Sequence, residues 1–286
     1  MDRSRKLVPE EFTHLYHTTC YKGLSEVQRL KYNQLYGLRI NEQFIQFEEI
    51  FIGGVIHRLK RHRALKDDSW LLSEMESVLQ DEQQHTLMFT QYNRGLRPEL
   101  YRHSNELFTL LSTVERSLFT SFLTMPGLLP GLLWLLLAME ELTTAISCAL
   151  IDHPHSDELE TDYIKLHRYH FHDEQRHVGI DRKMIRMIYH STPAPLQRLN
   201  AMLFRYVFQN ILRPRRSTLE VICQLVREES ELKAMEEDMI KQVMALAPNT
   251  AFPANLVLAE KLPVLHDLGN KYPEYRLPMM DSSSQY

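Results

Sequence analysis

Two matching pentapeptides decide the fold class of this chain: residues 81–85 read Asp-Glu-Gln-Gln-His, and residues 173–177 read Asp-Glu-Gln-Arg-His. Residues three apart lie on one face of an α-helix, so each pentapeptide directs a carboxylate and an imidazole toward the same point. Two such helices that face each other would supply Glu82, His85, Glu174 and His177 to one shared centre. One E-x-x-H is common, whereas a pair preceded by Asp in a helical chain indicates a site for two metal ions.

The composition predicts an all-α protein. Only 9 of the 286 residues are Gly, hydrophobic residues make up 44%, and no alternating apolar run ends in the Asn-Gly or Asp-Gly turns of hairpins. The net charge of −4 gives no electrostatic reason to expect nucleic acid as a partner. The three Cys are isolated from one another, which is typical of a reduced, cytoplasmic protein. They are Cys20, Cys148 and Cys223.

Neither the N-terminus nor the most apolar segment predicts membrane association. The first residues are charged, and no apolar stretch follows them, so we expect no secretory signal. The most apolar segment, residues 128–139, is closed by Glu140 and Glu141. A transmembrane helix needs about 20 apolar residues, so this segment is expected to be a buried core helix.

Turn and capping residues divide the chain into helices. The four that carry the candidate site are expected at about 26–61, 70–92, 130–151 and 157–189. Asp68 or Ser69 is the expected cap of the second. Further helices are expected at 104–124, 196–211, 217–230, 231–246 and 255–268. We expect one domain over residues 1–270, in which residues 1–25 form an irregular arm. A flexible tail is expected over residues 271–286.

The first long helix offers two adjacent carboxylates, Glu48 and Glu49. A two-metal centre in a four-helix bundle takes one Glu from each of the two helices that lack the pentapeptide. Steps of three or four residues from Glu48 reach only apolar positions: Phe44, Ile45, Phe51 and Ile52. Steps of one or two helical turns from Glu49 reach a mostly polar face of Glu42, Gln46, Gly53 and His57. Glu48 is therefore predicted to point inward.

The helix over 130–151 poses the same choice between Glu140 and Glu141. Glu141 shares a face with Leu137, Ala138, Ala145 and Cys148. Glu140 lines up with Thr143, Thr144 and Ser147. Burial favours Glu141, which we predict as the ligand. Glu140 stays open as the alternative, because the upstream half of this helix is apolar on every side.

The last of the four helices carries an additional imidazole. His170 lies one turn before Glu174, which gives the pattern H-x-x-x-E-x-x-H and a seventh candidate ligand. A ligating imidazole is oriented by a hydrogen bond to its other nitrogen. We expect these bonds to cross the bundle, from Asp173 to His85 and from Asp81 to His177. Buried carboxylates without cations are costly, and carboxylate with imidazole suits iron or manganese.

This pattern resembles the ferritin-like di-iron superfamily. The added His170 resembles one branch of it, the arylamine N-oxygenases of the p-aminobenzoate N-oxygenase (AurF) type, which have a third His in H-x-x-x-E-x-x-H on the last ligand helix. Residues 28–190 carry the whole match. The resemblance implies a ferritin-like four-helix bundle with additional helices, and the metal ligands Glu48, Glu82, His85, Glu141, His170, Glu174 and His177.

The resemblance also implies an activity. Two iron ions would activate O₂ and oxidise the nitrogen of a small, aromatic amine, free or bound to a carrier protein, toward hydroxylamine, nitroso or nitro products. The electrons would come from an external reductase or ferredoxin, since the sequence has no flavin or iron–sulfur motif. The alternatives are hydroxylation or desaturation at carbon and, from another class, iron handling. A homodimer and a mixed manganese–iron centre both stay open.

Overall fold

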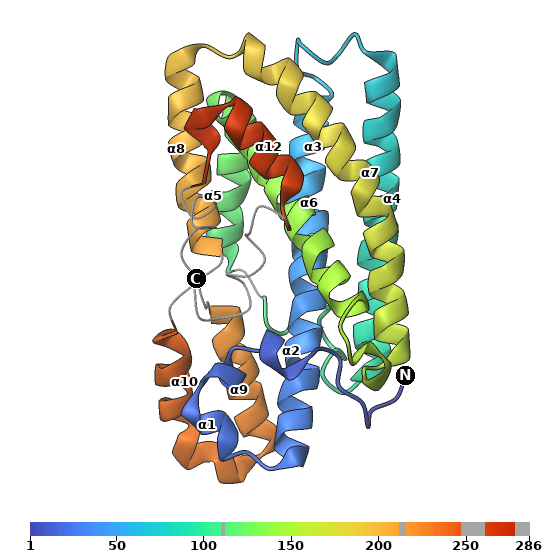
Figure 1. The fold of residues 1–286 in the computed structure, drawn as a ribbon, viewed down its shortest axis with the longest axis vertical. Helices are drawn as coiled ribbons and strands as arrows, with labels where there is room; N and C mark the ends of the chain where they lie inside the picture. The colour runs from blue at the N-terminus through green and yellow to red at the C-terminus, as the bar shows by residue number, and fades with distance from the viewer. Residues whose placement is uncertain (110–111, 212–215, 247–260, 278–286) are drawn as a thin grey trace.

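The chain is mostly helical in the residues that the structure describes, which are 1–109, 112–211, 216–246 and 261–277 (Figure 1). In these ranges the computed structural model contains no strand, and it has one isolated bridge between Lys6 and Leu159. The prediction of an all-α, ferritin-like bundle is therefore confirmed.

Four long helical rods form the centre of the fold (Figure 1). Three of them are α4 (Ser69–Leu96), α6 (Leu129–Ile151) and α7 (Thr161–Ser191). The fourth begins as α2 (Glu26–Gln46), passes through a π-helical segment, Phe47–Ile52, and ends as α3 (Gly53–Leu59). The rod predicted over 26–61 is thus continuous, but its middle is wound more loosely than an α-helix.

Local capping sets where two of the rods begin. Asp68 is the cap of α4, and its carboxylate accepts a hydrogen bond from the N–H of Leu71 at 2.9 Å. The expectation that α7 begins near residue 157 is wrong by about one turn. Glu160 is the cap, because its carboxylate accepts the N–H of Tyr163 at 2.7 Å, and α7 begins at Thr161.

Shorter helices cover part of the bundle as a second layer (Figure 1). Here α8 (Ala194–Ile211) packs on α6, α9 (Arg216–Glu228) on α2, α10 (Glu236–Met244) on α9, and α12 (Pro263–Lys271) on α6 and α7. α5 (Thr113–Thr124) packs on α3. The remaining turns of helix are η1 (Glu10–Phe12), η2 (Leu15–His17), α1 (Thr19–Lys22), η4 (Pro126–Leu128), η5 (Ser156–Glu158), η6 (Ser230–Met235) and η7 (Pro273–Tyr275).

The helix predicted over 104–124 forms only from Thr113 onward. The preceding segment is held in a non-helical conformation by Glu42, a fully buried residue of α2. Its carboxylate accepts the backbone N–H groups of Leu107, Phe108 and Thr109 at 3.0, 2.7 and 3.0 Å. These N–H groups are thereby satisfied outside a helix, which removes the reason to continue one.

The expectation of a flexible tail from Lys271 is wrong for residues 271–277. Residues Pro273–Tyr275 form a 3₁₀ turn, and the ring of Tyr275 stacks on Trp134 of α6 with centroids 4.3 Å apart. This stacking buries a large apolar area, so the segment is part of the fold. Residues 278–286 of the expected tail, and residues 255–260 of the expected last helix, lie outside the described ranges.

α6 is the apolar helix of the core. In the described part of the chain it is the one helix long and apolar enough to cross a membrane, with a mean hydropathy of 1.5 over its most apolar window. That window is 67% buried inside the molecule, as expected for the core helix of a soluble protein. Its two acidic residues, Glu140 and Glu141, are both buried.

Candidate metal centre

Seven ionisable side chains from all four rods meet inside the bundle, and none is more than 4% exposed. Their possible ligand atoms form two groups, and the atoms within a group lie within 4.8 Å of one another. The first group is Glu48, His85 and His170. The second is Glu82, Glu140, Glu174 and His177. Six of the seven predicted ligands are brought together, and Glu140 takes the place of Glu141.

Glu174 connects the two groups. Its Oε1 atom lies 3.5 Å from Nδ1 of His85, 3.2 Å from Nε2 of His170 and 3.5 Å from Nδ1 of His177. His170 Nε2 is also 3.1 Å from Oε1 of Glu48, and His177 Nδ1 is 3.0 Å from Oε1 of Glu82. The Glu174 carboxylate therefore lies between the imidazoles of the two groups.

Several buried polar atoms of this cluster have no hydrogen-bond partner among the described residues. Both carboxylate oxygens of Glu82 and of Glu174 lack one, as do Oε2 of Glu140 and Nδ1 of His85 and His177. Buried polar atoms are nearly always paired, and buried carboxylates require a cation. Four carboxylates would neutralise two divalent ions, and three imidazoles would add neutral donors. The donor set therefore fits a pair of non-haem iron or manganese ions.

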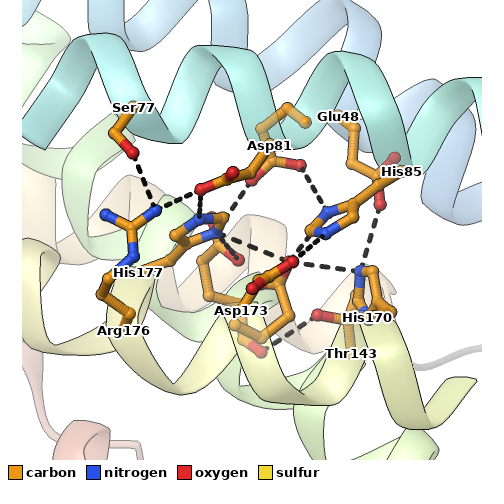
Figure 2. Close-up of polar contacts among 12 residues, drawn as sticks. Glu48, Ser77, Asp81, His85, Thr143, His170, Asp173, Arg176 and His177 are labelled. Carbon is orange, nitrogen blue, oxygen red and sulfur yellow. Dashed lines mark hydrogen bonds and ion pairs between the residues drawn. The ribbon is translucent and has the colours of Figure 1, made fainter.

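Two hydrogen bonds to the outer ring nitrogens cross the bundle as predicted (Figure 2). Nε2 of His85 lies 3.1 Å from Oδ2 of Asp173, and Nε2 of His177 lies 3.3 Å from Oδ2 of Asp81. A carboxylate only accepts, so each Nε2 carries a proton, and each Nδ1 faces the centre. The two contacts expected across the bundle are therefore present in the structure.

Arg176, the variable position of the second pentapeptide, also contacts one of these two Asp residues. Its guanidinium hydrogen-bonds the carboxylate of Asp81, and it also donates to Oε2 of Glu74 at 2.9 Å. The hydrogen bond from His177 and the charge of Arg176 lower the pKa of Asp81 despite its partial burial. Sequence reasoning missed Arg176, although its position one residue before His177 places it toward α4.

The prediction of Glu141 as a ligand is wrong. Glu140 faces the cluster, with Oε2 4.0 Å from Nδ1 of His177. Glu141 instead accepts the backbone N–H groups of Val264 and Leu265 at 2.8 and 2.6 Å, at the start of α12. Both residues are buried, so the burial argument could not separate them. The face of Glu141 is covered by a helix more than a hundred residues away along the chain.

Glu48 faces inward as predicted, whereas Glu49 is exposed. Glu48 lies in the π-helical segment, and its Oε2 accepts a hydrogen bond from the hydroxyl of Thr86 at 3.2 Å. Short π-helical stretches occur often at functional sites, because the extra residue in the turn changes the direction of a side chain. Nothing in the sequence pattern indicated this segment.

The clustered residues differ in the direction in which their pKa values are shifted. Burial raises the pKa values of Glu48 and Glu140 well above the ordinary range, and neighbouring carboxylates raise them further. Burial lowers the pKa of His170 to about 3, so its ring is neutral at physiological pH. Burial opposes ionisation of Glu174 too, but His170 and His177 outweigh it and hold the pKa of Glu174 below the ordinary value. A neutral imidazole and an ionised carboxylate are the forms that bind metal.

Two further buried residues adjoin the cluster. Asp181 lies one turn after His177 on α7, and its Oδ2 has no hydrogen bond. Burial raises the pKa of Asp181 well above the ordinary value. Sequence reasoning missed it, although its i+4 spacing from His177 was a usable signal. His167 lies on the other side and contacts Ser147 at 3.1 Å, so it is a neighbour of the cluster and not a member.

The chain matches the model of one protein family. Residues 1–250 match the family model described as p-aminobenzoate N-oxygenase AurF. No curated protein sequence matches the chain. The matched region contains all seven clustered side chains, whereas α12 lies beyond it.

Proposed function

Because the chain belongs to the p-aminobenzoate N-oxygenase AurF family, we propose that it oxidises the nitrogen of a small, aromatic amine at a non-haem di-iron centre. The observation that carries the proposal is the third imidazole: His170 joins the first group of ligands in addition to the two D-E-x-x-H pairs. The family is one of oxygenases, and the donor set fits iron. The amine substrate is free or attached to a carrier protein, in the cytoplasm.

The seven clustered residues would hold the metal pair. Glu48, His85 and His170 would bind one ion, and Glu82, Glu140 and His177 the other, with Glu174 between them. A reduced iron pair supplies the reduction of O₂ and the transfer of one oxygen atom to nitrogen. The first oxidation balances as R-NH₂ + O₂ + 2 electrons + 2 H⁺ giving R-NHOH + H₂O, so an external electron donor is required.

His170 differs from the other two imidazoles in how the protein holds it. Its Nε2 faces Glu48 and Glu174, and its Nδ1 has no hydrogen-bond partner among the described residues. Two aromatic rings enclose it instead, Phe44 and Phe89, with centroids 5.1 and 5.3 Å away. These rings exclude water from one side of the centre and keep His170 neutral. Its ring therefore offers a lone pair without a competing proton.

The test measures the metal content of the protein and then identifies the reaction product. The protein is purified, loaded with iron, reduced without air and exposed to ¹⁸O₂ with a panel of arylamines. We expect two irons per chain and ¹⁸O-labelled hydroxylamine, nitroso or nitro products by mass spectrometry. Products labelled at carbon would show that the protein is a hydroxylase and not an N-oxygenase. Fewer than two metals per chain would contradict the di-iron site.

Adjacent glutamates give a matched pair of variants for the same experiment. Glu48→Gln removes a candidate ligand, so the iron content should fall toward one ion and N-oxygenation should be lost. Glu49→Gln changes its exposed neighbour on the same π-helical segment and should leave both values unchanged. Equal iron content and equal activity in the two variants would contradict the assignment of Glu48.

A further inference from the structure

The outer surface of α4 and α7 adjoins Asp81 and Asp173, the partly exposed residues that contact His177 and His85. These two helices form one edge of the molecule (Figure 1). α12 packs on α7 near Arg182, which pairs with Asp267, and the other labelled helices of the second layer lie on other sides of the bundle (Figure 1). Exposed side chains line the outer surface of α4 and α7, among them Gln83, Gln84, Leu87, Arg168, Tyr169 and His172. We call this surface the α4–α7 face.

At two places on this face, a single carboxylate lies between solvent and an imidazole of the cluster. Asp173 is 26% exposed and hydrogen-bonds His85, and Asp81 is 28% exposed and hydrogen-bonds His177. By contrast, the seven clustered side chains are at most 4% exposed. Solvent therefore reaches the outer partners of the two imidazoles, but it does not reach the imidazoles themselves.

Tyr169 adds an aromatic contact at the same place. Its side chain is 57% exposed, although large apolar side chains are usually covered. Its ring meets the ring of His85 edge-on, with centroids 6.5 Å apart and an interplanar angle of 85°. Tyr169 and Asp173 thus both contact His85 from the outside.

The exposed charge next to Tyr169 on α7 is positive. Arg168 is exposed and has no ion-pair partner among the described residues, whereas Lys165 pairs with Asp162 at 3.3 Å. The acidic groups at the level of the centre are engaged: Asp173 with His85, and Asp81 with His177 and Arg176. The chain as a whole carries a net charge of −4, so an acidic partner would be repelled elsewhere and drawn to this face.

We propose that the α4–α7 face is the docking surface of an acidic electron-transfer protein, and that its electrons enter through Tyr169 and Asp173 to His85. This inference rests on the proposed function, which requires two external electrons for each O₂. In each encounter the donor cofactor loses one electron and one ferric ion becomes ferrous. Two encounters reduce the pair.

The test measures reduction and binding, apart from turnover. The iron-loaded, oxidised protein is mixed without air with a reduced plant-type [2Fe–2S] ferredoxin, an acidic probe, and the rate is followed by stopped-flow absorbance. Arg168→Glu should lower the second-order rate constant about tenfold at low ionic strength, and added salt should reduce the difference. Calorimetric titration with oxidised ferredoxin should show a matching loss of affinity. Tyr169→Ala should also slow reduction, whereas Tyr169→Phe retains the ring and should not.

The chain offers matched controls for both changes. Arg186 lies on the same helix, is exposed and has no ion-pair partner among the described residues, about 27 Å along the axis from Arg168. Tyr206 is an exposed Tyr on α8. Arg186→Glu and Tyr206→Ala should leave the ferredoxin rate unchanged. Reduced methyl viologen, a small donor that needs no docking surface, should reduce every variant at the same rate.

The outcomes separate the two proposals. If the centre binds two irons and oxidises amines with viologen as donor, but Arg168→Glu and Arg186→Glu react alike with ferredoxin, the docking surface is wrong and the proposed function stands. No reduction of the parent protein by ferredoxin, with viologen reduction intact, overturns the acidic partner. Loss of amine oxidation with every donor overturns the proposed function instead.

Discussion

Asp173 on α7 and His85 on α4 are joined across the bundle, with Oδ2 of the carboxylate 3.1 Å from Nε2 of the imidazole. Each belongs to a different D-E-x-x-H pentapeptide, and Asp81 and His177 repeat the contact in the opposite direction at 3.3 Å. Each repeat therefore orients the imidazole of the other. This reciprocity explains why the Asp that precedes each Glu is part of the pattern.

Removal of one orienting carboxylate should weaken metal binding at one position. We expect Asp173→Ala to lower the affinity of the ion near His85 about 10- to 100-fold, because the imidazole loses its fixed tautomer and orientation. Competition with a chromophoric chelator measures this change. Gln175→Ala, an exposed residue two positions further along α7, is the control. Equal affinities in both variants would show that Asp173 does not orient His85.

Substitution of the adjacent residues Glu140 and Glu141 should change different properties, metal content in one case and stability in the other. Glu140→Gln should lower the metal content while the fold is kept. Glu141→Gln should keep two metals per chain but lower the free energy of unfolding by about 2 kcal/mol, because a charged acceptor of two N–H groups of α12 is lost. Metal analysis and urea denaturation distinguish them. A loss of metal in Glu141→Gln alone would restore the original prediction.

Glu42 should be important for stability although it is remote from the centre. Glu42→Ala should lower the free energy of unfolding by about 3 kcal/mol, since it leaves the buried N–H groups of Leu107, Phe108 and Thr109 without an acceptor. Urea denaturation measures the loss, with exposed Glu49→Ala as the control. Limited proteolysis should also cleave the variant faster between residues 104 and 112. A change below about 0.5 kcal/mol would contradict this role.

His14 should make the fold sensitive to acid. Burial and the charge of Arg39 lower the pKa of His14 from 6.5 to about 3, and its Nδ1 contacts the hydroxyl of Tyr36 at 2.6 Å. The folded state keeps this ring neutral, whereas the unfolded chain binds a proton below pH 6.5. Stability is therefore lost as the pH falls from 7 to 5, and the part due to His14 is about 2 kcal/mol at pH 5.

The variant that checks this is His14→Gln, which removes the titrating ring and keeps an acceptor for Tyr36. Its free energy of unfolding should decline less than that of the parent between pH 7 and 5, in urea titrations at both values. His17→Gln, at an exposed histidine three residues away, should follow the parent. Parallel pH profiles of parent and His14→Gln would show that His14 is not buried in neutral form.

Much of the fold and most of the site could be predicted from local pattern. The capping role of Asp68, the four rods and the inward direction of Glu48 follow from helical spacing and the polarity of neighbouring residues. The late start of α5 did not follow, because it depends on Glu42, which is more than sixty residues from the segment it holds. Periodicity describes one helix at a time and carries no information about such contacts.

The sequence by itself determined which residues share a face: the paired pentapeptides, the extra His170 one turn before Glu174, and the Asp residues that orient the imidazoles. Only the tertiary structure decided which faces meet. It assigned Glu140 to the centre because α12 covers Glu141, and it left the α4–α7 face uncovered beside His85. The physical reason is that helical geometry fixes the direction of a side chain about its own axis, while packing of distant elements decides what lies in that direction.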